Sequence, residues 1–392
     1  MPAAAAPANA TAPTPRPGSR LPGGLIYVTA GMPGLQRLKR GKSFAYRRPD
    51  GSWERSEDEI ARIRKLAIPP AYTDVWICPR PNGHLQATGL DARGRRQYRY
   101  HPEWRRLRDE HKFERMRAFG QALPRIRARV ARDLQPRRGA PALSRTVVLA
   151  TIVRLLDTTF LRVGNEEYAT TNQSYGLTTL RRRHAGVRGG QITLRFRGKS
   201  GVEQQATLDD PRVARVVRRC QQLPGQELFQ YEDEDGTRRT VGSSDVNDYL
   251  REITEGARRA PLTGDGDAEL HFTAKDFRTW HGTAQALELT RLACSGAGAG
   301  DDEAEPAKYS AKAILAEVAR QLGNTPAVCK KSYVHPAVLE LGAHLASGSG
   351  PGMQSVWARL GASAAPRGLS AAERRLLAFL RKPPRLPAAL KR

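Results

Sequence analysis

The sequence has few residues of the kinds that build disulfides, metal centres or membrane spans. Its cysteines lie far apart and form no Cys-x-x-Cys pair, at Cys78, Cys220, Cys294 and Cys329. This spacing argues against a disulfide framework or a structural zinc site and favours a reducing compartment. No stretch approaches about 18 consecutive apolar residues, and residues 1–20 lack the apolar core of a secretory signal. We therefore expect a cytoplasmic protein with no membrane span.

The signatures of metal and nucleotide sites are missing as well. The eight histidines are scattered, with no His-x-x-x-His pair, and the sequence contains no Asp-x-Asp-x-Asp cluster. The acidic run at residues 232–236 lacks the later glutamate that completes a calcium-binding loop, so we interpret it as a solvated turn. No glycine-rich nucleotide-binding loop is evident. We expect neither a metal nor another cofactor.

Positive charge is the strongest compositional signal. The chain has 65 Lys and Arg residues against 39 Asp and Glu residues, a formal net charge of +26. Residues 93–138 alone carry 16 basic residues against five acidic ones. A genome that prefers Arg over Lys would explain the ratio of these two residues but not the sign of the charge. Because such an excess is most often neutralised by a polyanion, we expect the chain to bind nucleic acid.

The order of local patterns predicts an α+β protein of two domains with two tails. Residues 1–22 are rich in Ala, Pro and Thr and are expected to be disordered. Residues 23–104 contain short β-rich runs separated by turns, with a helix capped by Ser56, which predicts a small antiparallel β domain. Residues 105–346 are expected to form a mainly helical domain carrying a small β-hairpin. Residues 347–392 are expected to form a basic, mobile or partly helical extension.

Within the second domain, the apolar spacing predicts a buried helix over residues 147–168 that ends near Gly164. Two alternating runs around residues 197–201 predict a hairpin. Residues 295–307, rich in Gly and acidic residues, are expected to form a loop. Further helices are predicted at residues 211–222, 244–257, 274–290, 308–322 and 332–346.

Tyr333 lies after two lysines and shortly before a proline that interrupts helices. A tyrosine in this setting can belong to the core, lie at the surface, or act as an oxygen nucleophile. Phosphoryl transfer needs a nucleophile, positive groups for the non-bridging oxygens, and a proton for the leaving oxygen. Arginine suits the second task because its planar fork donates two hydrogen bonds to a phosphate and stays charged. Arg162, Lys199 and Arg278 lie in segments that could supply these groups.

Five segments resemble, in the same order, those of the type IB DNA topoisomerases, in particular their small bacterial, poxvirus-like branch. They are Trp76–His101, Arg162–Tyr168, Gly198–Lys199, Lys275–Thr279 and Asn324–Pro336. The resemblance covers about residues 22–346. It implies an enzyme that relaxes supercoiled duplex DNA by transient single-strand cleavage through a 3′-phosphotyrosyl intermediate, strand swivelling and religation. It also implies that neither ATP nor a metal is required, with magnesium at most stimulatory.

Carried over to this sequence, the resemblance implies five catalytic residues. Tyr333 is then the nucleophile, and Arg162 and Arg278 bind the scissile phosphate. Lys199, in the hairpin turn, is the general acid for the leaving 5′ oxygen. Asn324 takes the place where many relatives have His. Both side chains can donate a hydrogen bond to a phosphate oxygen, but Asn cannot be charged, which argues against acid–base chemistry at this position.

Further residues are candidates for DNA contacts: Gln97, Tyr98, Tyr100, Tyr168, Lys275, Lys330 and Lys331. The alternation of tyrosine and arginine at residues 98–100 suits phosphate contacts, although an ordinary half-exposed strand has the same pattern. Poxvirus relatives carry lysines after the first catalytic arginine, where this chain has Asn165-Glu166-Glu167. That departure puts the poxviral base preference in doubt.

Two other readings remain open. A tyrosine site-specific recombinase shares the catalytic logic, but it usually has a His-x-x-Arg box where this chain has Lys275-Asp-Phe-Arg278, and a helical rather than β-rich first domain. A non-enzymatic nucleoid or RNA-binding protein would need only the charge. Under the preferred reading, we expect a nucleoid-associated monomer that closes as a clamp around double-stranded DNA.

Overall fold

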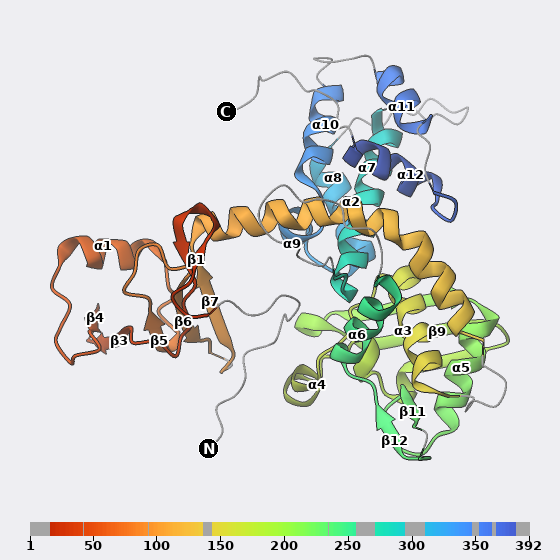
Figure 1. Cartoon of the computed structure of the whole chain (residues 1–392), viewed down its shortest axis with the longest axis horizontal. Coiled ribbons are helices and arrows are strands. Elements are labelled where there is room, and N and C mark those ends of the chain that lie inside the picture. The colour runs from red at the N-terminus through yellow and green to blue at the C-terminus, as the bar shows by residue number, and fades with distance from the viewer. Residues whose placement is uncertain are drawn as a thin grey trace. The chain divides into compact units, whose positions relative to one another are not determined.

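The structure is a computed structural model of the chain (Figure 1). It describes residues 16–41, 43–92, 94–135, 143–233, 235–255, 271–294, 310–346, 353–362 and 366–381. The chain divides into two compact units, here unit 1, up to Glu114, and unit 2, from Arg115 onward. The division falls inside helix α2 (Pro102–Asp133), as does the boundary at residue 104 that the sequence suggested. Each unit is described by itself.

Unit 1 is built on a five-stranded antiparallel sheet with the strand order β4-β3-β5-β6-β7. Its strands are β3 (Leu35–Arg40), β4 (Ser43–Arg47), β5 (Thr73–Ile77), β6 (Leu85–Leu90) and β7 (Arg96–Tyr100). Helix α1 (Glu57–Lys65) begins after Ser56, whose hydroxyl accepts a hydrogen bond from the Glu59 N–H, so the predicted cap is confirmed. Its buried Ile63 packs into the sheet core.

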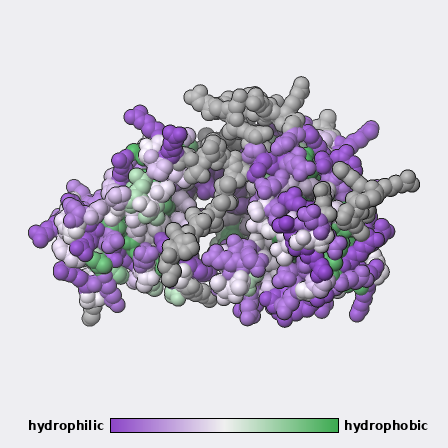
Figure 2. All heavy atoms as spheres, turned by 60° about the horizontal axis from the view of Figure 1, so that its bottom comes forward, coloured by the Kyte–Doolittle hydropathy of each residue, from purple (hydrophilic) through white to green (hydrophobic). Residues whose placement is uncertain are grey.

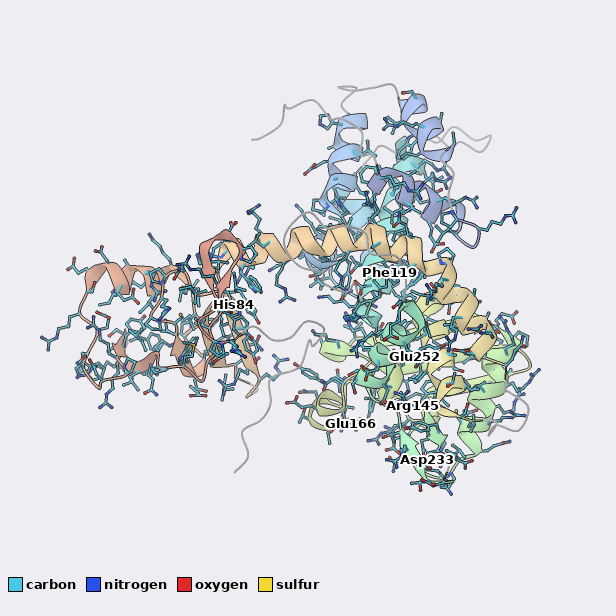
Figure 3. All side chains as sticks on the ribbon, in the orientation of Figure 1. His84, Phe119, Arg145, Glu166, Asp233 and Glu252 are labelled. Atoms are coloured by element: carbon cyan, nitrogen blue, oxygen red, sulfur yellow. The ribbon has the colours of Figure 1, made fainter. Side chains whose placement is uncertain are left out.

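A short hairpin precedes this sheet, formed by β1 (Arg20–Leu21) and β2 (Leu25–Ile26) around the turn η1 (Pro22–Gly24). The prediction of a disordered tail up to residue 22 is therefore wrong for Arg20 and Leu21, which pair with the next strand. Residues 1–15 lie outside the described residues. Next to this hairpin, His84 is buried and stacks on Tyr27 with ring centroids 4.6 Å apart (labelled in Figure 3).

Unit 2 is mainly helical and carries small sheets, which confirms the predicted α+β class. Its helices are α3 (Arg145–Thr159), α4 (Glu166–Asn172), α5 (Pro211–Gln222), α6 (Ser243–Thr254), α7 (Ala274–Cys294), α8 (Ala311–Leu322), α9 (Pro326–Ser332), α10 (Pro336–Ala346), α11 (Met353–Gly361) and α12 (Ala371–Arg381). A three-stranded antiparallel sheet has the order β10-β9-β8, with β8 (Ala185–Arg188), β9 (Gln191–Arg197) and β10 (Glu203–Asp209). A second hairpin pairs β11 (Gln230–Glu232) with β12 (Arg238–Thr240). Short 3-10 turns complete it: η2 (Leu177–Thr179), η3 (Arg182–His184) and η4 (Lys199–Gly201).

Helix α7 is the centre of unit 2. It packs against α8, α10 and α12, and also against α3 and α6. Helix α3 is apolar around most of its circumference and buried over most of its length, as expected for a core helix.

Polar side chains cover most of the face seen in Figure 2, and apolar ones appear there only in small patches. In the part of the chain that the structure describes, no helix is both long and apolar enough to cross a membrane.

Two of the predicted helices differ most from the structure. The helix expected over residues 147–168 ends at Thr159, because Phe160 adopts the left-handed conformation with φ 58°. The helix expected over residues 332–346 begins only at Pro336, as α10. Residues 326–332 form a separate helix, α9, and Tyr333 lies in the turn between the two. Thr325 caps α9 through its hydroxyl, and Pro336 occupies the first position of α10, where a missing N–H costs nothing.

The expected C-terminal extension contains two helices in its described parts, α11 and α12. Residues 366–381 contribute Leu376, Leu377 and Phe379 to the buried core, and α12 packs on α7 (Figure 1). The loop expected at residues 295–307 and the basic residues 382–392 lie outside the described residues. The polar anchor of α12 is Glu373, which accepts hydrogen bonds from Arg127 on α2 at 2.8 Å and 2.9 Å.

Candidate active site

Tyr333 occupies the turn between α9 and α10. It is the C-terminal cap of α9, with φ −130° and ψ −26°, and its N–H donates to the Cys329 carbonyl at 3.0 Å. The side chain is half-buried. The guanidinium carbon of Arg278 lies 4.9 Å from the centroid of the tyrosine ring. The nucleophile candidate and one phosphate-binding candidate are therefore in direct contact, although they are 55 residues apart in the sequence.

Arg278 is a buried cation, 3% exposed, held by backbone carbonyls. One terminal nitrogen donates to the carbonyl of Phe160 and the other to that of Leu322, at 2.7 Å for the latter. Both carbonyls lie at helix ends, where no intrahelical N–H is available to them. The third nitrogen, Nε, has no hydrogen-bond partner among the described residues.

Arg162 follows α3 in an extended segment and donates a hydrogen bond to Oδ1 of Asn324. This contact orients the amide, because the oxygen faces the guanidinium and the Nδ2 group must then point elsewhere. Nδ2 is buried and has no partner within the described residues. Gly323, with φ 56°, ends α8 and turns the chain into Asn324. The structure thus brings Arg162 and Asn324 together and leaves one buried donor free.

The cluster of Tyr333, Arg278, Arg162 and Asn324 is electropositive. In the described part of the chain, neither Arg278 nor Arg162 forms an ion pair with a carboxylate. Burial, and then the charge of Arg162, lowers the pKa of the Arg278 guanidinium from its ordinary value. A buried cation without a counter-ion raises the free energy of the folded protein. This arrangement is therefore typical of a site that binds an anion.

The charges also act on the phenol. Burial raises the pKa of Tyr333, but the nearby charges of Arg278 and Arg162, with a contribution from Lys275, outweigh it, so the pKa lies below that of an ordinary tyrosine. Burial raises the pKa of the neighbouring Cys329 thiol. A thiol that stays protonated is a poor nucleophile, so the phenol of Tyr333 is the oxygen or sulfur group best prepared for attack.

Lys199 is not brought into this cluster. It lies exposed in the turn η4 at the tip of the β9–β10 hairpin, and its ammonium takes part in none of the hydrogen bonds or ion pairs of the described residues. The residues that flank this turn are held in place. Ser174 donates to the Gly198 carbonyl at 2.7 Å, and Gln204 on β10 packs directly against Gly323. The turn end of the hairpin is therefore anchored beside Asn324, while the side chain of Lys199 is exposed to solvent.

The expected DNA contacts of unit 2 are exposed. Lys330 and Lys331 lie on α9 just before Tyr333, and Lys275 lies in the first turn of α7, one turn before Arg278. Tyr168 is 44% exposed on α4, the helix labelled at Glu166 in Figure 3.

The expected DNA contacts of unit 1 have partners of their own. Tyr98 and Tyr100 stack at 6.1 Å between ring centroids and pack against a buried apolar cluster. Burial raises the pKa of Tyr100. Gln97 donates to Asp91 at 3.0 Å. These three side chains contribute to the packing of unit 1, whether or not their exposed edges touch DNA.

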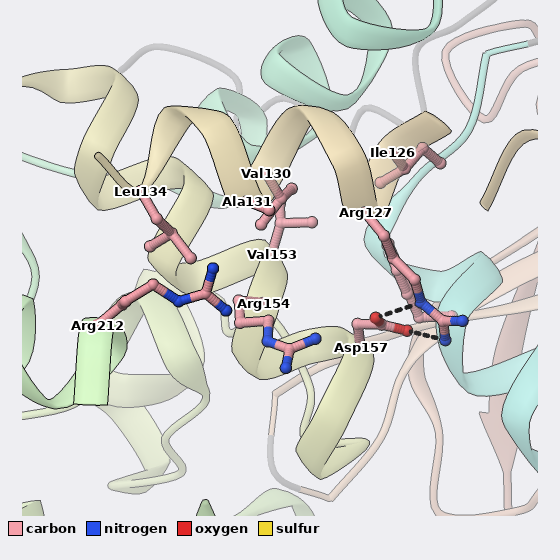
Figure 4. A pocket seen from close by; sticks show the side chains of 10 residues that line it. Ile126, Arg127, Val130, Ala131, Leu134, Val153, Arg154, Asp157 and Arg212 are labelled. Atoms are coloured by element: carbon pink, nitrogen blue, oxygen red, sulfur yellow. Dashed lines mark hydrogen bonds and ion pairs between the residues drawn. The ribbon is translucent and has the colours of Figure 1, made fainter. Parts of the chain in front are cut away.

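An ionic network behind Arg278 escaped the sequence reasoning. Asp157 on α3 accepts hydrogen bonds from Arg127 (Figure 4) and lies 3.0 Å from Nε2 of His281. The His281 ring is tilted against that of Phe160, with centroids 4.6 Å apart. Although burial opposes it, hydrogen bonding from His281 and Arg127 holds the pKa of Asp157 well below its usual range. Phe160 accepts a hydrogen bond from Arg278 through its carbonyl and contacts His281 through its ring. The network is therefore linked to the cluster through Phe160. No group of three His, Cys, Asp or Glu residues suited to a metal occurs among the residues described.

Comparison with known proteins agrees with this architecture. The sequence profile of the catalytic core of eukaryotic DNA topoisomerase I matches residues 101–343, and that of the N-terminal domain of bacterial DNA topoisomerase IB matches residues 43–91. The chain is 33% identical over 314 residues to the DNA topoisomerase 1B of Acanthamoeba polyphaga mimivirus, which covers 79% of this chain and 88% of the viral protein. The chain therefore belongs to the type IB DNA topoisomerases and is an enzyme of that type.

Proposed function

We propose that the protein relaxes supercoiled duplex DNA by cleaving one strand through Tyr333, letting the duplex swivel, and resealing the strand. The observation that carries this proposal is the carboxylate-free pair of guanidiniums around Tyr333, with Arg278 buried against its ring and Arg162 half-buried. Such a site is suited to one phosphate of a DNA backbone. Family membership supports the same activity.

In the cleavage step, the Tyr333 phenol gives up its proton to solvent and its Oη attacks the phosphorus. A bond forms between Oη and the 3′ phosphate, and the bond from phosphorus to the 5′ oxygen breaks. Arg278 and Arg162 donate to the non-bridging oxygens, and Asn324 donates through its free Nδ2. The depressed pKa of the phenol makes its ionisation easier.

Lys199 is proposed to protonate the leaving 5′ oxygen. In the free protein its ammonium lies at the exposed tip of the hairpin, so DNA must bring the tip and the phosphate together. Catalytic contacts are often completed only in the substrate complex. Religation is the reverse reaction, in which the 5′ hydroxyl attacks the phosphotyrosine. Because the phosphoester bond is conserved, the reaction needs no ATP, and the two arginines supply the charge for which other enzymes use a metal.

DNA binding is proposed to use both units of a monomer that clamps the duplex in the cytoplasmic nucleoid. In unit 2, the exposed side chains of Lys275, Lys330, Lys331 and Tyr168 can contact phosphates. In unit 1, Gln97, Tyr98 and Tyr100 offer their exposed edges. Magnesium is proposed to be at most stimulatory.

Plasmid relaxation in the presence of EDTA and without ATP tests the proposal. The wild-type protein should relax both positively and negatively supercoiled plasmid, and Tyr333→Phe should relax neither. The phenylalanine keeps the ring that packs on Arg278, so a loss of activity reports on the hydroxyl and not on folding. Failure of the wild-type protein would overturn the function, whereas activity of the variant would overturn the site.

A further inference from the structure

One threonine of α7 differs from its neighbours in its hydrogen bonds. Thr279 and Thr290 donate to the carbonyls four residues earlier, at 3.3 Å and 2.7 Å. This is the ordinary behaviour of a threonine inside a helix. Thr283 is completely buried, yet it directs its hydroxyl away from its own helix, to the turn that carries Tyr333.

The hydroxyl of Thr283 makes two bonds across that turn. It donates to the Tyr333 carbonyl at 2.8 Å and accepts from the His335 N–H at 3.2 Å. A hydroxyl has one proton and two lone pairs, so both bonds can exist together. The two bonds fix the backbone of the turn that carries the nucleophile. One partner is the carbonyl of Tyr333 itself, and the other is the N–H two residues later.

The helix and the turn also touch directly at this point. A Cβ atom on Gly282 would lie 3.0 Å from Leu322 Cδ1 and 3.4 Å from the Cβ of Tyr333. Gly282 thus leaves the space that the turn occupies, and Thr283 fastens the turn in that space. Leu322, in turn, supplies a carbonyl to Arg278.

Helix α7 therefore carries Arg278, a candidate phosphate-binding residue, and also holds the turn of Tyr333, the candidate nucleophile. Arg278, five residues before Thr283, lies about 7.5 Å away along the axis and contacts the ring of Tyr333. We propose that Thr283 is a positioning residue, which sets the orientation of the Tyr333 hydroxyl relative to a phosphate held at Arg278. This inference rests on the proposed function. Since Thr283 is buried, it acts on the attack step and not on DNA binding.

The test measures the rate at which SDS traps covalent protein–plasmid adducts with protein in excess, together with plasmid binding by filter retention. Thr283→Val removes the hydroxyl at nearly constant volume, and Thr290→Val, at a buried site of the same helix, is the matched control. We expect Thr283→Val to lower the trapping rate about 10-fold to 100-fold, because small misplacements of a reacting group cost this much. Plasmid affinity should change less than about twofold, and Thr290→Val should trap at about the wild-type rate.

Restoration of the hydroxyl separates positioning from general stability. Thr283→Ser should trap at close to the wild-type rate, and Thr283→Ala should be slow. These two side chains are smaller than threonine and differ only in the hydroxyl, so the pair replaces the valine variant if that variant does not fold. Equal rates for the serine and alanine variants, or equal losses in Thr283→Val and Thr290→Val, would overturn the inference. If the wild-type protein itself traps no adduct, the proposed function fails instead.

Discussion

At the scale of single residues, the geometry of the site depends on how the buried guanidinium of Arg278 is held. Arg278 is fixed by two carbonyls at helix ends, which orient the guanidinium without neutralising it. Arg37 in unit 1 shows the same device in a structural role, donating to the carbonyls of Ile68, Pro69 and Tyr72. Arg37 also packs on an aromatic ring, that of Phe44, at 4.2 Å. What distinguishes Arg278 is a second guanidinium close enough to depress its pKa.

Arg278→Lys tests that geometry. Lysine keeps the charge, but a single ammonium cannot reach both carbonyls and a phosphate, so we expect adduct formation to slow by about 100-fold or more. Plasmid affinity should fall far less, because many other cations contribute to it. Filter retention and SDS trapping measure the two quantities separately. A lysine variant that cleaves as fast as wild type would show that charge alone suffices.

The lowered pKa of Tyr333 can be measured without DNA. The difference in phenolate absorbance between wild type and Tyr333→Phe gives the titration of this one tyrosine, which should lie below the ordinary value of about 10. A positive charge favours the phenolate, so Lys275→Gln should move the titration to higher pH. Lys331→Gln serves as the control, since it removes an exposed charge that is not among the main causes of the shift. Equal shifts in both variants would contradict the assignment.

At the scale of elements, the site is assembled from helix ends and one hairpin. Arg162 follows the end of α3, Asn324 follows α8, and Tyr333 ends α9. Such positions leave backbone carbonyls without intrahelical partners, and in this site those carbonyls bind Arg278. Helix α12 adds a remote support, since Glu373 joins Arg127 and also accepts a hydrogen bond from Trp280 on α7 at 3.1 Å.

Glu373→Gln should therefore destabilise unit 2. It leaves the partly buried guanidinium of Arg127 with fewer partners, and breaking a buried ion pair costs about 3 kcal/mol. Denaturant unfolding gives the free energy of unfolding, and Glu340→Gln, an exposed carboxylate on α10, is the control. If both variants are equally stable, α12 is not anchored in the way described.

The elements also show where sequence reasoning succeeds. Helix α5 begins and ends at the predicted residues, because Asp210 caps it and Pro211 occupies its first position. The hairpin and the Ser56 cap are similarly local. The break at Phe160 has no such signal: a phenylalanine carries no preference for a left-handed φ, and tertiary contacts decide it. The sequence also gives no signal for the carbonyl contacts of Arg278. Nor does it predict that the hydroxyl of Thr283 bonds outside its own helix.

At the scale of the whole molecule, the net charge of +26 governs encounter with DNA. Affinity should fall steeply with salt, as counterions are released from each phosphate that a cation contacts. If Lys330 and Lys331 contact phosphates, the double variant to Gln should reduce the slope of log K against log salt by about 2. Arg238→Gln on β12, well separated from α9 in Figure 1, should leave the slope nearly unchanged. A similar loss for both would point to a diffuse electrostatic effect.

The most direct test of the central claim is to identify the residue and the DNA end that the protein joins. Wild-type protein is mixed with plasmid, trapped with SDS and digested with protease and nuclease, and the adduct is analysed by mass spectrometry. The account predicts a nucleotide linked through its 3′ phosphate to the peptide that contains Tyr333, together with a free 5′ hydroxyl on the other DNA end. An adduct at another residue, or a link to a 5′ phosphate, would contradict it.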